Sequence, residues 1–398
     1  MSRIDFKAEA AALRDEMVAR RRDLHRHPEL AFEEVRTAAL IADELRNLGL
    51  EVQTGVGRTG VVGILEGDQD GPTILYRADM DALPIQEEND VDYASQTPGV
   101  MHACGHDGHV TIALGVAKLL VRQRRQMAGR VKFVFQPAEE TGAGARAMID
   151  DGVLIDPAPD VTIGLHLWNP LSIGQVGIAE GAVMAGSSIF QIIIQGRGGH
   201  AAMPYTTIDP VVCASQVVMA LHALVGRRFN AMEGAVVLSV TSLETSSKAY
   251  NVIPEQVEIR GTFRTFDAEA SRQLEQYICE TTESLCRSMN CSVKVRVDHQ
   301  TFPVVNHPEM VARLRRLFGR MIGEDRLDTN ARTMAAEDVS FLMNDRPGVY
   351  FFLGSSNKDR GLNYDHHHPR FDFDEDALPL GVALMSAALA DFVLNDGE

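Results

Sequence analysis

The chain of 398 residues lacks several features that mark specialised classes of protein. The net charge is -17 and no run rich in Lys or Arg interrupts it, so the chain offers no basic surface for nucleic acid or an anionic membrane. No uninterrupted apolar run reaches the roughly 18 residues of a membrane span, and residues 1–30 contain no continuous apolar segment typical of a secretory signal. We therefore expect a soluble, cytoplasmic protein without nucleic-acid or membrane partners.

Cysteine is also scarce. The five cysteines are an odd number and none forms a C-x-x-C pair, so they do not indicate a disulfide framework. Cys213, Cys279 and Cys286 fall in apolar helical patterns and are expected to be small core residues. This cysteine usage favours a reducing compartment.

The length of the chain and its 45% hydrophobic composition exceed what one core usually organises, so about two domains are expected. Residues 5–48 predict two helices. After them, strands and helices alternate at the spacing of parallel crossover units, which predicts an α/β fold with a sheet covered on both faces. Strands are predicted at residues 60–67, 72–80, 131–137 and 161–168.

From about residue 186 the pattern changes to strands and helices in the order βαββαβ. This order predicts a small α+β sheet with helices on one face, complete in itself. Residues 307–394 then resume the earlier pattern of helix and strand. We therefore predict a discontinuous first domain of residues 1–185 and 300–398, with residues 186–299 inserted as a second domain.

The segment GVGRTG, residues 55–60, matches the G-x-G-x-x-G pattern of dinucleotide-binding proteins. That fingerprint must open a helix, because the pyrophosphate rests on the N-terminus of the helix. Here the following residues are apolar and strand-like. We interpret the segment as a glycine turn between two strands.

Ionisable side chains gather at predicted strand ends, where ligands bind in open α/β sheets. They are Asp79 and Asp81 in ILYRADMDALP, Cys104 and His106 in HACGHDGH, Glu139 and Glu140 in VFQPAEETGAG, and His166 in IGLHLW. Near the C-terminus, HHHPRFDF adds His366, His367 and His368.

Each of these groups alone has a plain structural interpretation. His166 after an apolar run can be a hydrogen-bonded core residue, and Glu139 with Glu140 can begin a solvated helix. Together, a thiolate, imidazoles and carboxylates form the mixed set that borderline transition metals prefer. The helix predicted from about Asp107 favours the thiolate of Cys104. Adjacent residues of an extended chain face opposite ways, so one glutamate can bind a metal while the other faces a substrate.

Eight segments, in this order, resemble the M20 family of binuclear metallo-aminoacylases, in its branch of hippurate hydrolases and indole-acetyl-amino-acid hydrolases. They are HRHPELAFEE, RADMDALPI, HACGHDGH, QPAEE, GRGGHAAMP, NVIP, AEDVSFL and HHHPRFDF, and they extend over essentially the whole chain. The resemblance implies a phosphorylase/hydrolase-like, zinc-peptidase-like α/β catalytic domain. It also implies that the inserted ferredoxin-like α+β domain is a lid that dimerises.

The metal-ligand positions of the family fall on Cys104, His106, Glu140, His166 and His367. Five ligands exceed what a single catalytic zinc uses, which indicates two divalent ions. Thiolate and imidazole ligands accept zinc, manganese, cobalt or nickel. The C-terminal ligand is assigned to His367 by its register from Pro369, and the neighbours His366 and His368 remain alternatives.

The general base of the family falls on Glu139. The resemblance implies hydrolysis of N-acyl amino acids, such as hippurate or N-acetyl amino acids, to a carboxylate and a free amino acid. In the expected mechanism, two divalent ions would lower the pKa of a water, and Glu139 would accept its proton and later pass it to the leaving amine. Asp81 is expected to orient a ligand or the base, while Asp79 either shares this duty or caps a turn.

The inserted domain supplies further residues in the family. His200 matches a lid histidine that reaches the active site of the partner subunit and stabilises the oxyanion. Asn251 and Arg264 match lid positions that hold the substrate. Tyr205 stands where many relatives carry a histidine. A homodimer through the lid, or a tetramer built from such dimers, is implied.

Three other hypotheses stay open. A peptidase of the same superfamily would use the same metals on dipeptides, but it would need a site for a free amino terminus. A non-catalytic ligand-binding protein could keep the fold, although it would not need the carboxylate of Glu139 beside the metals. A hydrolase with Cys104 as its nucleophile would withstand chelators, unlike a metalloenzyme.

Overall fold

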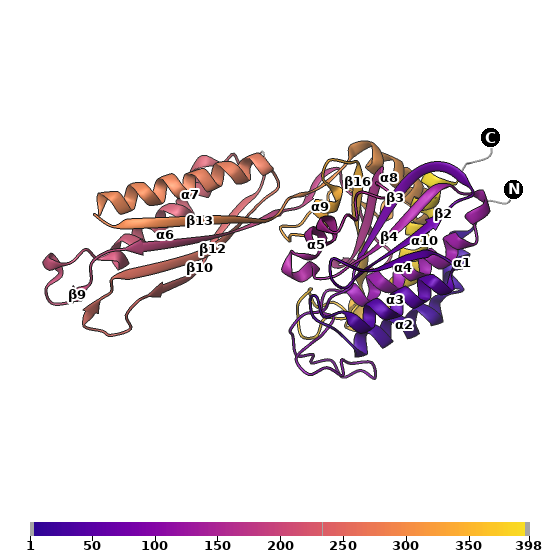
Figure 1. Cartoon of the computed structure of the whole chain (residues 1–398), viewed down its shortest axis with the longest axis horizontal. Helices are drawn as coiled ribbons and strands as arrows, with labels where there is room; N and C mark the ends of the chain where they lie inside the picture. Colours follow the sequence, from indigo (N-terminus) through magenta and orange to yellow (C-terminus); the bar gives the residue numbers. More distant parts are fainter. Residues whose placement is uncertain (1–3, 233, 395–398) are drawn as a thin grey trace. The chain divides into compact units, whose positions relative to one another are not determined.

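The computed structural model of the chain describes residues 4–232 and 234–394. The chain divides into two compact units, drawn in Figure 1. Unit 1 comprises residues 1–183, 305–332 and 338–398, and unit 2 comprises residues 184–304 and 333–337.

Unit 1 begins with three helices, where two were predicted. They are α1 (Phe6–Ala11), α2 (Arg14–Arg26) and α3 (Val35–Asn47). α1 is a separate short helix with its own N-cap, because the Asp5 side chain accepts a hydrogen bond from the Ala8 amide. The other helices of unit 1 are α4 (His106–Val121), α5 (Gly144–Asp150), α8 (Pro308–Ile322), α9 (Val339–Met343) and α10 (Ala377–Val393).

An eight-stranded sheet forms the centre of unit 1, in the order β1-β2-β4-β3-β5-β16-β6-β15. Its strands are β1 (Glu51–Val56), β2 (Gly60–Glu66), β3 (Gln69–Asp79), β4 (Ala128–Gln136), β5 (Val161–Ser172), β6 (Val176–Gly177), β15 (Leu327–Asp328) and β16 (Gly348–Ser356).

Most of this sheet follows the predicted parallel crossovers. β3 runs parallel to β4 and to β5, and β16 runs parallel to β5. The prediction is wrong at one edge, where β2 is antiparallel to β1 and to β4, and the short strand β6 is also antiparallel to β16. The glycine turn at residues 57–59 joins β1 to β2 as a hairpin, and a hairpin connection forces the antiparallel direction. The interpretation of GVGRTG as a turn between strands is confirmed.

Alternate residues of the central strands point to opposite faces of the sheet. Tyr76 and Phe133 lie in a core shared with α2, α3, α4, α8 and α10, whereas Leu75 and Val134 pack with α5 and α9. Figure 1 shows α3, α4 and α10 lying along the first of these faces. The prediction that helices cover both faces is confirmed.

Unit 2 contains a four-stranded antiparallel sheet in the order β10-β12-β8-β13. Along the chain its elements are β8 (Gly186–Gln195), α6 (Pro210–Arg228), β10 (Val236–Thr245), β12 (Gln256–Thr265), α7 (Ala268–Ser288) and β13 (Ser292–Thr301). This is the predicted βαββαβ order. Two short strands, β9 (Gly199–His200) and β11 (Val252–Ile253), pair with each other. β7 (Gly181–Met184) and β14 (Val304–Asn306) lie where the chain passes between the units.

By length and composition alone, α6 could cross a membrane, with a mean hydropathy of 1.4. Ser215, Gln216 and His222 interrupt this helix, so it contains no uninterrupted apolar run of that length. The helix buries Cys213, Val217, Leu221 and Leu224 in the core of unit 2. A spacing of three or four residues is that of an amphipathic helix lying on a sheet.

Candidate metal centre

Most of the candidate ligands lie outside the strands, near the carboxyl ends of β3 and β4, which run parallel and therefore end at the same edge of the sheet. His166 was predicted at a strand end but lies inside β5, two residues after Gly164, which pairs with Arg77 of β3. Glu139 and Glu140 were expected on an extended chain. They lie instead in a single 3₁₀ turn, η2 (Glu139–Thr141). The preceding residue, Ala138, has a φ of 53°, and this left-handed conformation turns the chain away from the direction of β4.

The five side chains proposed as ligands lie in two groups that share one member. Within each group the ligand atoms are within 4.8 Å of one another. The first group is Cys104, His106 and His166, and the second is Cys104, Glu140 and His367. A third group joins His106 with Glu139 and Glu140, so Glu139 lies beside the ligands. Cys104 belongs to both of the first two groups, so its sulfur could serve as a ligand in either of them.

The two buried histidines of the first group each direct Nε2 toward this centre. Nδ1 of His106 donates a hydrogen bond to the carbonyl oxygen of Asp81 at 2.9 Å, and Nδ1 of His166 donates to the carbonyl oxygen of Leu167 at 2.6 Å. In a neutral imidazole, the proton on Nδ1 leaves a lone pair on Nε2, which is the atom available to a metal. Nε2 of His166 lies 3.6 Å from Sγ of Cys104.

His367 faces the second group. Its Nε2 lies 3.3 Å from Oε2 of Glu140. The residue adopts a left-handed φ of 66°, and its amide donates to the carbonyl oxygen of Ala103 at 2.8 Å. This bond ties the C-terminal histidine segment to the residue that precedes Cys104.

The two neighbouring histidines have other partners. Nε2 of His366 donates to the carbonyl oxygen of Leu167 at 2.9 Å, and its ring stacks on Trp168 with 4.7 Å between centroids. Burial lowers the pKa of His366 to about 4. The ring of His368 stacks on Tyr364 at 4.5 Å. Of the three histidines, His367 is therefore the one whose ring nitrogen faces another candidate ligand.

The centre attracts positive charge. Burial opposes protonation of His106, but the charges of Asp79, Asp81 and Glu140 outweigh it and raise the pKa of His106 to about 10. A field that holds a proton on a buried imidazole also favours a divalent cation, which carries twice the charge.

Two buried polar atoms at the centre indicate whether a metal ion could be bound there. Within residues 4–232 and 234–394, Nε2 of His106 and Oε1 of Glu140 have no hydrogen-bond partner. Leaving a buried polar atom unsatisfied costs about 1–3 kcal/mol. A cation bound to both atoms would remove this cost, and the mixed donor set is the one that borderline divalent metals prefer. The residues therefore fit a pair of divalent cations.

His109 supports the centre, although no role was assigned to it from the sequence. Its Nδ1 donates to Oδ1 of Asp79 at 2.5 Å, and its Nε2 accepts a hydrogen bond from the amide of Leu167 at 2.9 Å. Both ring nitrogens are thus occupied. Asp79 also accepts a bond from Nη1 of Arg77 at 2.6 Å, so it orients side chains at the end of β3. The spacing of His106 and His109, three residues apart on a helix, could have signalled a shared face.

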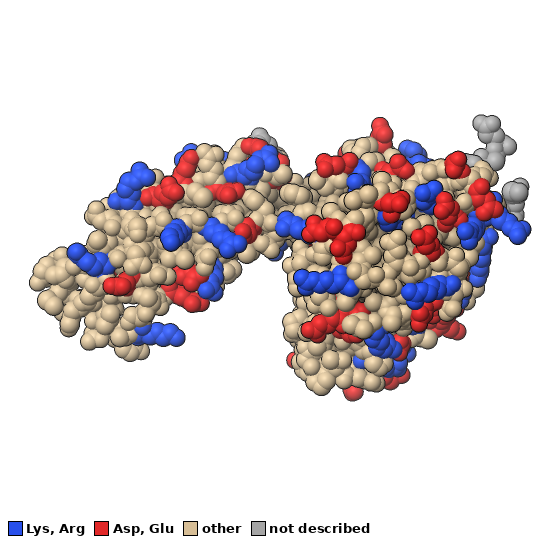
Figure 2. Space-filling model, in the orientation of Figure 1, with Lys and Arg blue, Asp and Glu red and all other residues tan. Residues whose placement is uncertain are grey.

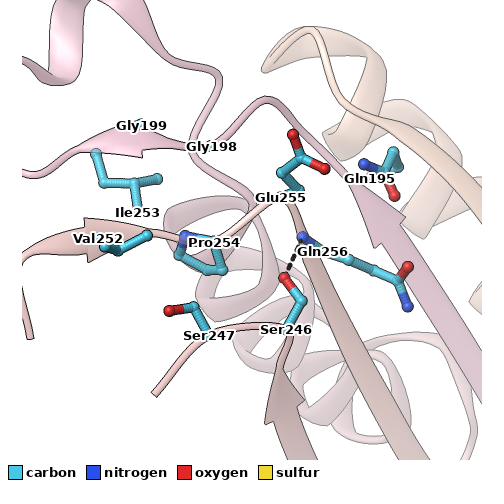
Figure 3. Close-up of a pocket in the computed structure, with 10 residues that line it drawn as sticks. All are labelled: Gln195, Gly198, Gly199, Ser246, Ser247, Val252, Ile253, Pro254, Glu255 and Gln256. Carbon is cyan, nitrogen blue, oxygen red and sulfur yellow. Dashed lines mark hydrogen bonds between the residues drawn. The ribbon is translucent and has the colours of Figure 1, made fainter. Parts of the chain in front are cut away.

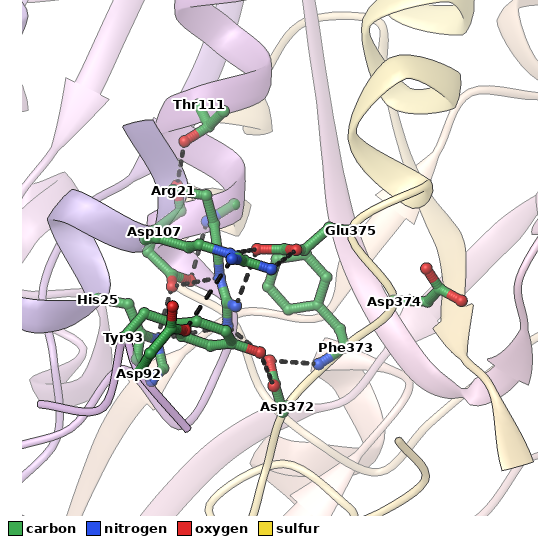
Figure 4. Close-up of polar contacts among 12 residues, drawn as sticks. Arg21, His25, Asp92, Tyr93, Asp107, Thr111, Asp372, Phe373, Asp374 and Glu375 are labelled. Carbon is green, nitrogen blue, oxygen red and sulfur yellow. Dashed lines mark hydrogen bonds and ion pairs between the residues drawn. The ribbon is translucent and has the colours of Figure 1, made fainter. Parts of the chain in front are cut away.

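A second buried network, shown in Figure 4, joins the segments that carry the ligands. Arg21 of α2 is completely buried, and it donates from Nε to Oδ2 of Asp107 at 2.9 Å and from Nη2 to Oδ1 of Asp372 at 2.7 Å. Its guanidinium lies 4.4 Å from the centroid of the Phe373 ring. Asp107 follows His106 directly, so Arg21 connects the start of α4 with the C-terminal loop. Sequence analysis missed this residue.

The residues proposed to contact the substrate lie in unit 2. His200 in β9 is exposed, and its Nδ1 accepts a hydrogen bond from the amide of Ala202 at 3.1 Å. Asn251 precedes β11, which pairs with β9, so the two residues are held on neighbouring chain segments. A hollow of about 500 Å³, shown in Figure 3, is lined by Gly199 and Val252, which adjoin His200 and Asn251 in the sequence. It is lined by Gly199, Ser246, Ser247, Val252, Pro254 and Glu255, among others.

Arg264 occupies a different part of unit 2, on β12. Its neighbour Phe263 is buried in the core with α6 and α7, so Arg264 points to the other face of the sheet. Burial lowers the pKa of Arg264. Among the described residues, no hydrogen bond joins Arg264 to His200 or Asn251.

An α/β sheet with a thiol, imidazoles and carboxylates gathered at one edge is the arrangement expected of a dinuclear metallohydrolase. The sequence signature of peptidase family M20/M25/M40 matches residues 75–391, and the chain belongs to this family. In the solved structures, the YXEP protein of Bacillus subtilis, a dinuclear metal binding peptidase of the M20 family, is similar. It superimposes with a TM-score of 0.83 at 31% identity, over 96% of this chain and 99% of that one.

Relatives of the chain carry the names of hydrolases. The chain is 39% identical to IAA-amino acid hydrolase ILR1-like 5 of Arabidopsis thaliana, over 96% of this chain and 88% of the relative. It is 37% identical to N-acetyl-L-cysteine deacetylase of Bacillus subtilis, over 92% and 86%. It is also 36% identical to thermostable carboxypeptidase 2 of Saccharolobus solfataricus, over 97% of each chain.

Proposed function

We propose that the protein is a metal-dependent amidohydrolase that cleaves N-acyl amino acids to a carboxylate and a free amino acid. The observation that carries this proposal is the convergence of the thiolate, imidazole and carboxylate ligands with Glu139 beside them. The names of the plant hydrolase and the bacterial deacetylase support the amide reaction. The two cations are taken from zinc, manganese, cobalt and nickel.

The mechanism assigns the proton transfers to Glu139. When bound, the two cations supply a water of lowered pKa and polarise the acyl oxygen. Glu139 lies within the group that contains His106 and Glu140, where it can accept the proton of the attacking water and deliver it to the leaving amine. Oδ2 of Asp81 accepts a hydrogen bond from the amide of Glu140 at 3.0 Å, so Asp81 holds the backbone next to the base.

The inserted unit completes the site in this proposal. Because Nδ1 of His200 accepts a bond from an amide, the neutral ring carries its proton on Nε2, and Nε2–H is the donor required by an oxyanion. We propose that His200 acts in the active site of the partner subunit. Asn251 and Arg264 hold the substrate, with the guanidinium facing the carboxylate of its amino-acid half.

The surface of unit 2 supports assembly through this unit. Tyr205 is 83% exposed, Met219 is 72% exposed and Tyr250 is fully exposed. On the face shown in Figure 2, few charged side chains lie at the end of unit 2 that carries β9. Exposed apolar side chains that cluster on one unit mark association surfaces. We propose a cytoplasmic homodimer, or a tetramer of two dimers. Sedimentation velocity of the wild type and of Tyr250→Asp tests the oligomeric state.

One experiment tests the reaction. The protein is stripped with a chelator and reloaded with each of the four ions in turn, and hydrolysis of hippurate, N-acetyl amino acids and dipeptides is measured. The proposal expects metal-dependent release of the free amino acid from N-acyl substrates. Preference for dipeptides would instead favour a peptidase, as the carboxypeptidase relative suggests. Activity that survives complete metal removal would refute the metal mechanism.

A further inference from the structure

A buried glutamate lies close to the turn that carries Glu139. Glu34 is completely buried, and it occupies the N-cap position of α3, where a short polar side chain usually accepts from the first helical amides. Its side chain makes no capping bond to α3. Oε1 instead accepts a hydrogen bond from the amide of Ala138 at 2.9 Å, and Oε2 accepts one from the hydroxyl of Thr59 at 2.5 Å. The carboxylate thus joins the residues before α3 to the turn after β4.

The amide that Glu34 accepts belongs to a strained residue. Ala138 has a φ of 53° and a ψ of 37°, the left-handed conformation that costs free energy for any residue with a Cβ. Such conformations persist only where the surroundings hold them. On the other side of Glu139, Asp81 accepts the amide of Glu140 at 3.0 Å. Two carboxylates therefore hold the backbone amides on either side of Glu139.

The loop that supplies Thr59 is itself held in place. It is the GVGRTG turn, in which Arg58 has a left-handed φ of 79° and stacks its guanidinium 4.2 Å from the centroid of the Phe32 ring. Phe32 also has a left-handed φ, of 63°. The amide of Gly57 donates to Oδ2 of Asp151 at 2.7 Å, next to the end of α5. The GVGRTG turn does not bind a nucleotide in this interpretation. It holds Thr59 in place, and the hydroxyl of Thr59 in turn fixes the position of Glu34.

We propose that Glu34 is a positioning residue, which holds Ala138 in its left-handed conformation and thereby orients Glu139 and Glu140. The inference rests on the proposed function for the role of Glu139, and on geometry alone for the turn. The hydrogen bond to the Ala138 amide is the essential contact, and the negative charge of Glu34 is not required. The substitution Glu34→Gln would preserve this contact, since the side-chain amide oxygen accepts from Ala138 while the amide nitrogen donates to Thr59.

The test compares Glu34→Leu, which removes both hydrogen bonds, with the matched control Glu34→Gln, which keeps them. Each is made with Ala138 and with Ala138→Gly, because glycine adopts the left-handed conformation without the steric cost. kcat, KM, and the visible absorption of the Co²⁺-loaded protein are measured for all variants. We expect Glu34→Leu to lower kcat by about 30-fold with KM changed by less than about threefold, and to alter the Co²⁺ spectrum through Glu140.

The double variant Glu34→Leu with Ala138→Gly shows whether Glu34 acts through Ala138. If Glu34 acts through Ala138, adding Ala138→Gly to Glu34→Leu recovers about tenfold of the lost kcat and restores the Co²⁺ spectrum, and Glu34→Gln stays within about threefold of the wild type. A wild-type kcat and spectrum in Glu34→Leu, or no recovery with Ala138→Gly, would overturn the inference. If Glu34→Leu does not fold, Thr59→Val takes its place, with an expected loss of about fivefold and the same rescue.

The proposed hydrolysis and the positioning role of Glu34 can be refuted independently of each other. If the wild type hydrolyses none of the N-acyl substrates, the proposed function fails. The Co²⁺ spectra of the same variants then still report whether Glu34 positions the turn that carries Glu140. Spectra that follow the pattern of loss and rescue support the inference, and spectra that do not change overturn it.

Discussion

Replacing Arg21 by leucine tests whether the buried charge network holds the ligand segments together. Arg21 is completely buried between Asp107 at 2.9 Å and Asp372 at 2.7 Å, with Glu375 at 3.5 Å. Leucine fills part of the space but supplies no charge. Asp372 would then remain buried without the guanidinium, and Asp107 would keep only His25, whose Nδ1 lies 2.7 Å from Oδ2 of Asp107.

We expect Arg21→Leu to lower the free energy of unfolding strongly, because it removes the cation of a buried ion pair and leaves the carboxylates in place. Removing one partner of a buried ion pair costs about 3–5 kcal/mol, since the other charge stays uncompensated. The neighbouring Arg22 is the matched control. It bonds Glu375 at 2.8 and 2.7 Å, but its side chain is 33% exposed, so Arg22→Leu should cost no more than about 1 kcal/mol. We expect Arg21→Leu to destabilise unit 1 by about 2–4 kcal/mol more than Arg22→Leu.

The chain offers a selective probe for this measurement. Trp168 is the single tryptophan, and it lies in β5 with its ring stacked on His366. Its fluorescence during urea unfolding therefore reports unit 1 without a contribution from unit 2. The midpoint and slope of the transition give the free energy of unfolding for each variant.

Equal losses for Arg21→Leu and Arg22→Leu would refute this reasoning. A second check removes the stranded charge. Adding Asp372→Asn to Arg21→Leu should recover about 1 kcal/mol or more, although Asp372→Asn alone destabilises the wild type. A double variant less stable than Arg21→Leu would show that uncompensated charge is not the cause.

Three further predictions concern the centre itself. Glu139→Gln should lower kcat by about 10²–10⁴-fold while metal content per chain stays unchanged, and near-normal turnover would remove Glu139 from its role as base. Cys104→Ser should lower the metal retained per chain after dialysis, measured by elemental analysis, and full retention would contradict its assignment as a ligand. Burial raises the pKa of Glu34 in the folded chain above its ordinary value. As pH rises through the window between these two pKa values, the unfolded chain releases the proton more readily, so the free energy of unfolding falls. Glu34→Gln should therefore be more stable than the wild type at pH 7 and equal to it at pH values below that window, in melts followed by Trp168 fluorescence; equal stability at both would contradict the shift.

Much of the fold follows from local patterns. The period of apolar residues predicts α4, α7 and α10, and the alternation of strands and helices predicts the parallel pairing of β3, β4 and β5. The antiparallel edge was missed because β1 has no buried face and so shows no apolar pattern. GVGRTG was interpreted as a turn between two strands, but no bounds were predicted for the first of them, and the antiparallel direction of β2 was not predicted.

The sequence by itself determined the chemical types at the candidate centre: a thiol, imidazoles and carboxylates placed after apolar strands. The resemblance selected His367 by its register from Pro369, but the local sequence alone leaves all three adjacent histidines as candidates to face Glu140. That choice depends on a left-handed backbone at His367 and on its bond to Ala103, and both arise from the packing of two distant segments.

Only the tertiary structure shows which residues hold the segments of the centre in place. Arg21 and Glu34 lie more than 80 residues before the groups they hold in α4 and at Ala138. Glu34 ends the segment HRHPELAFEE, but no local pattern marks either residue as buried. They become buried only when helices and turns from separate regions pack together. Burial then makes an unpaired charge or amide so costly that partners must be supplied, and it is this cost that fixes the geometry around Glu139.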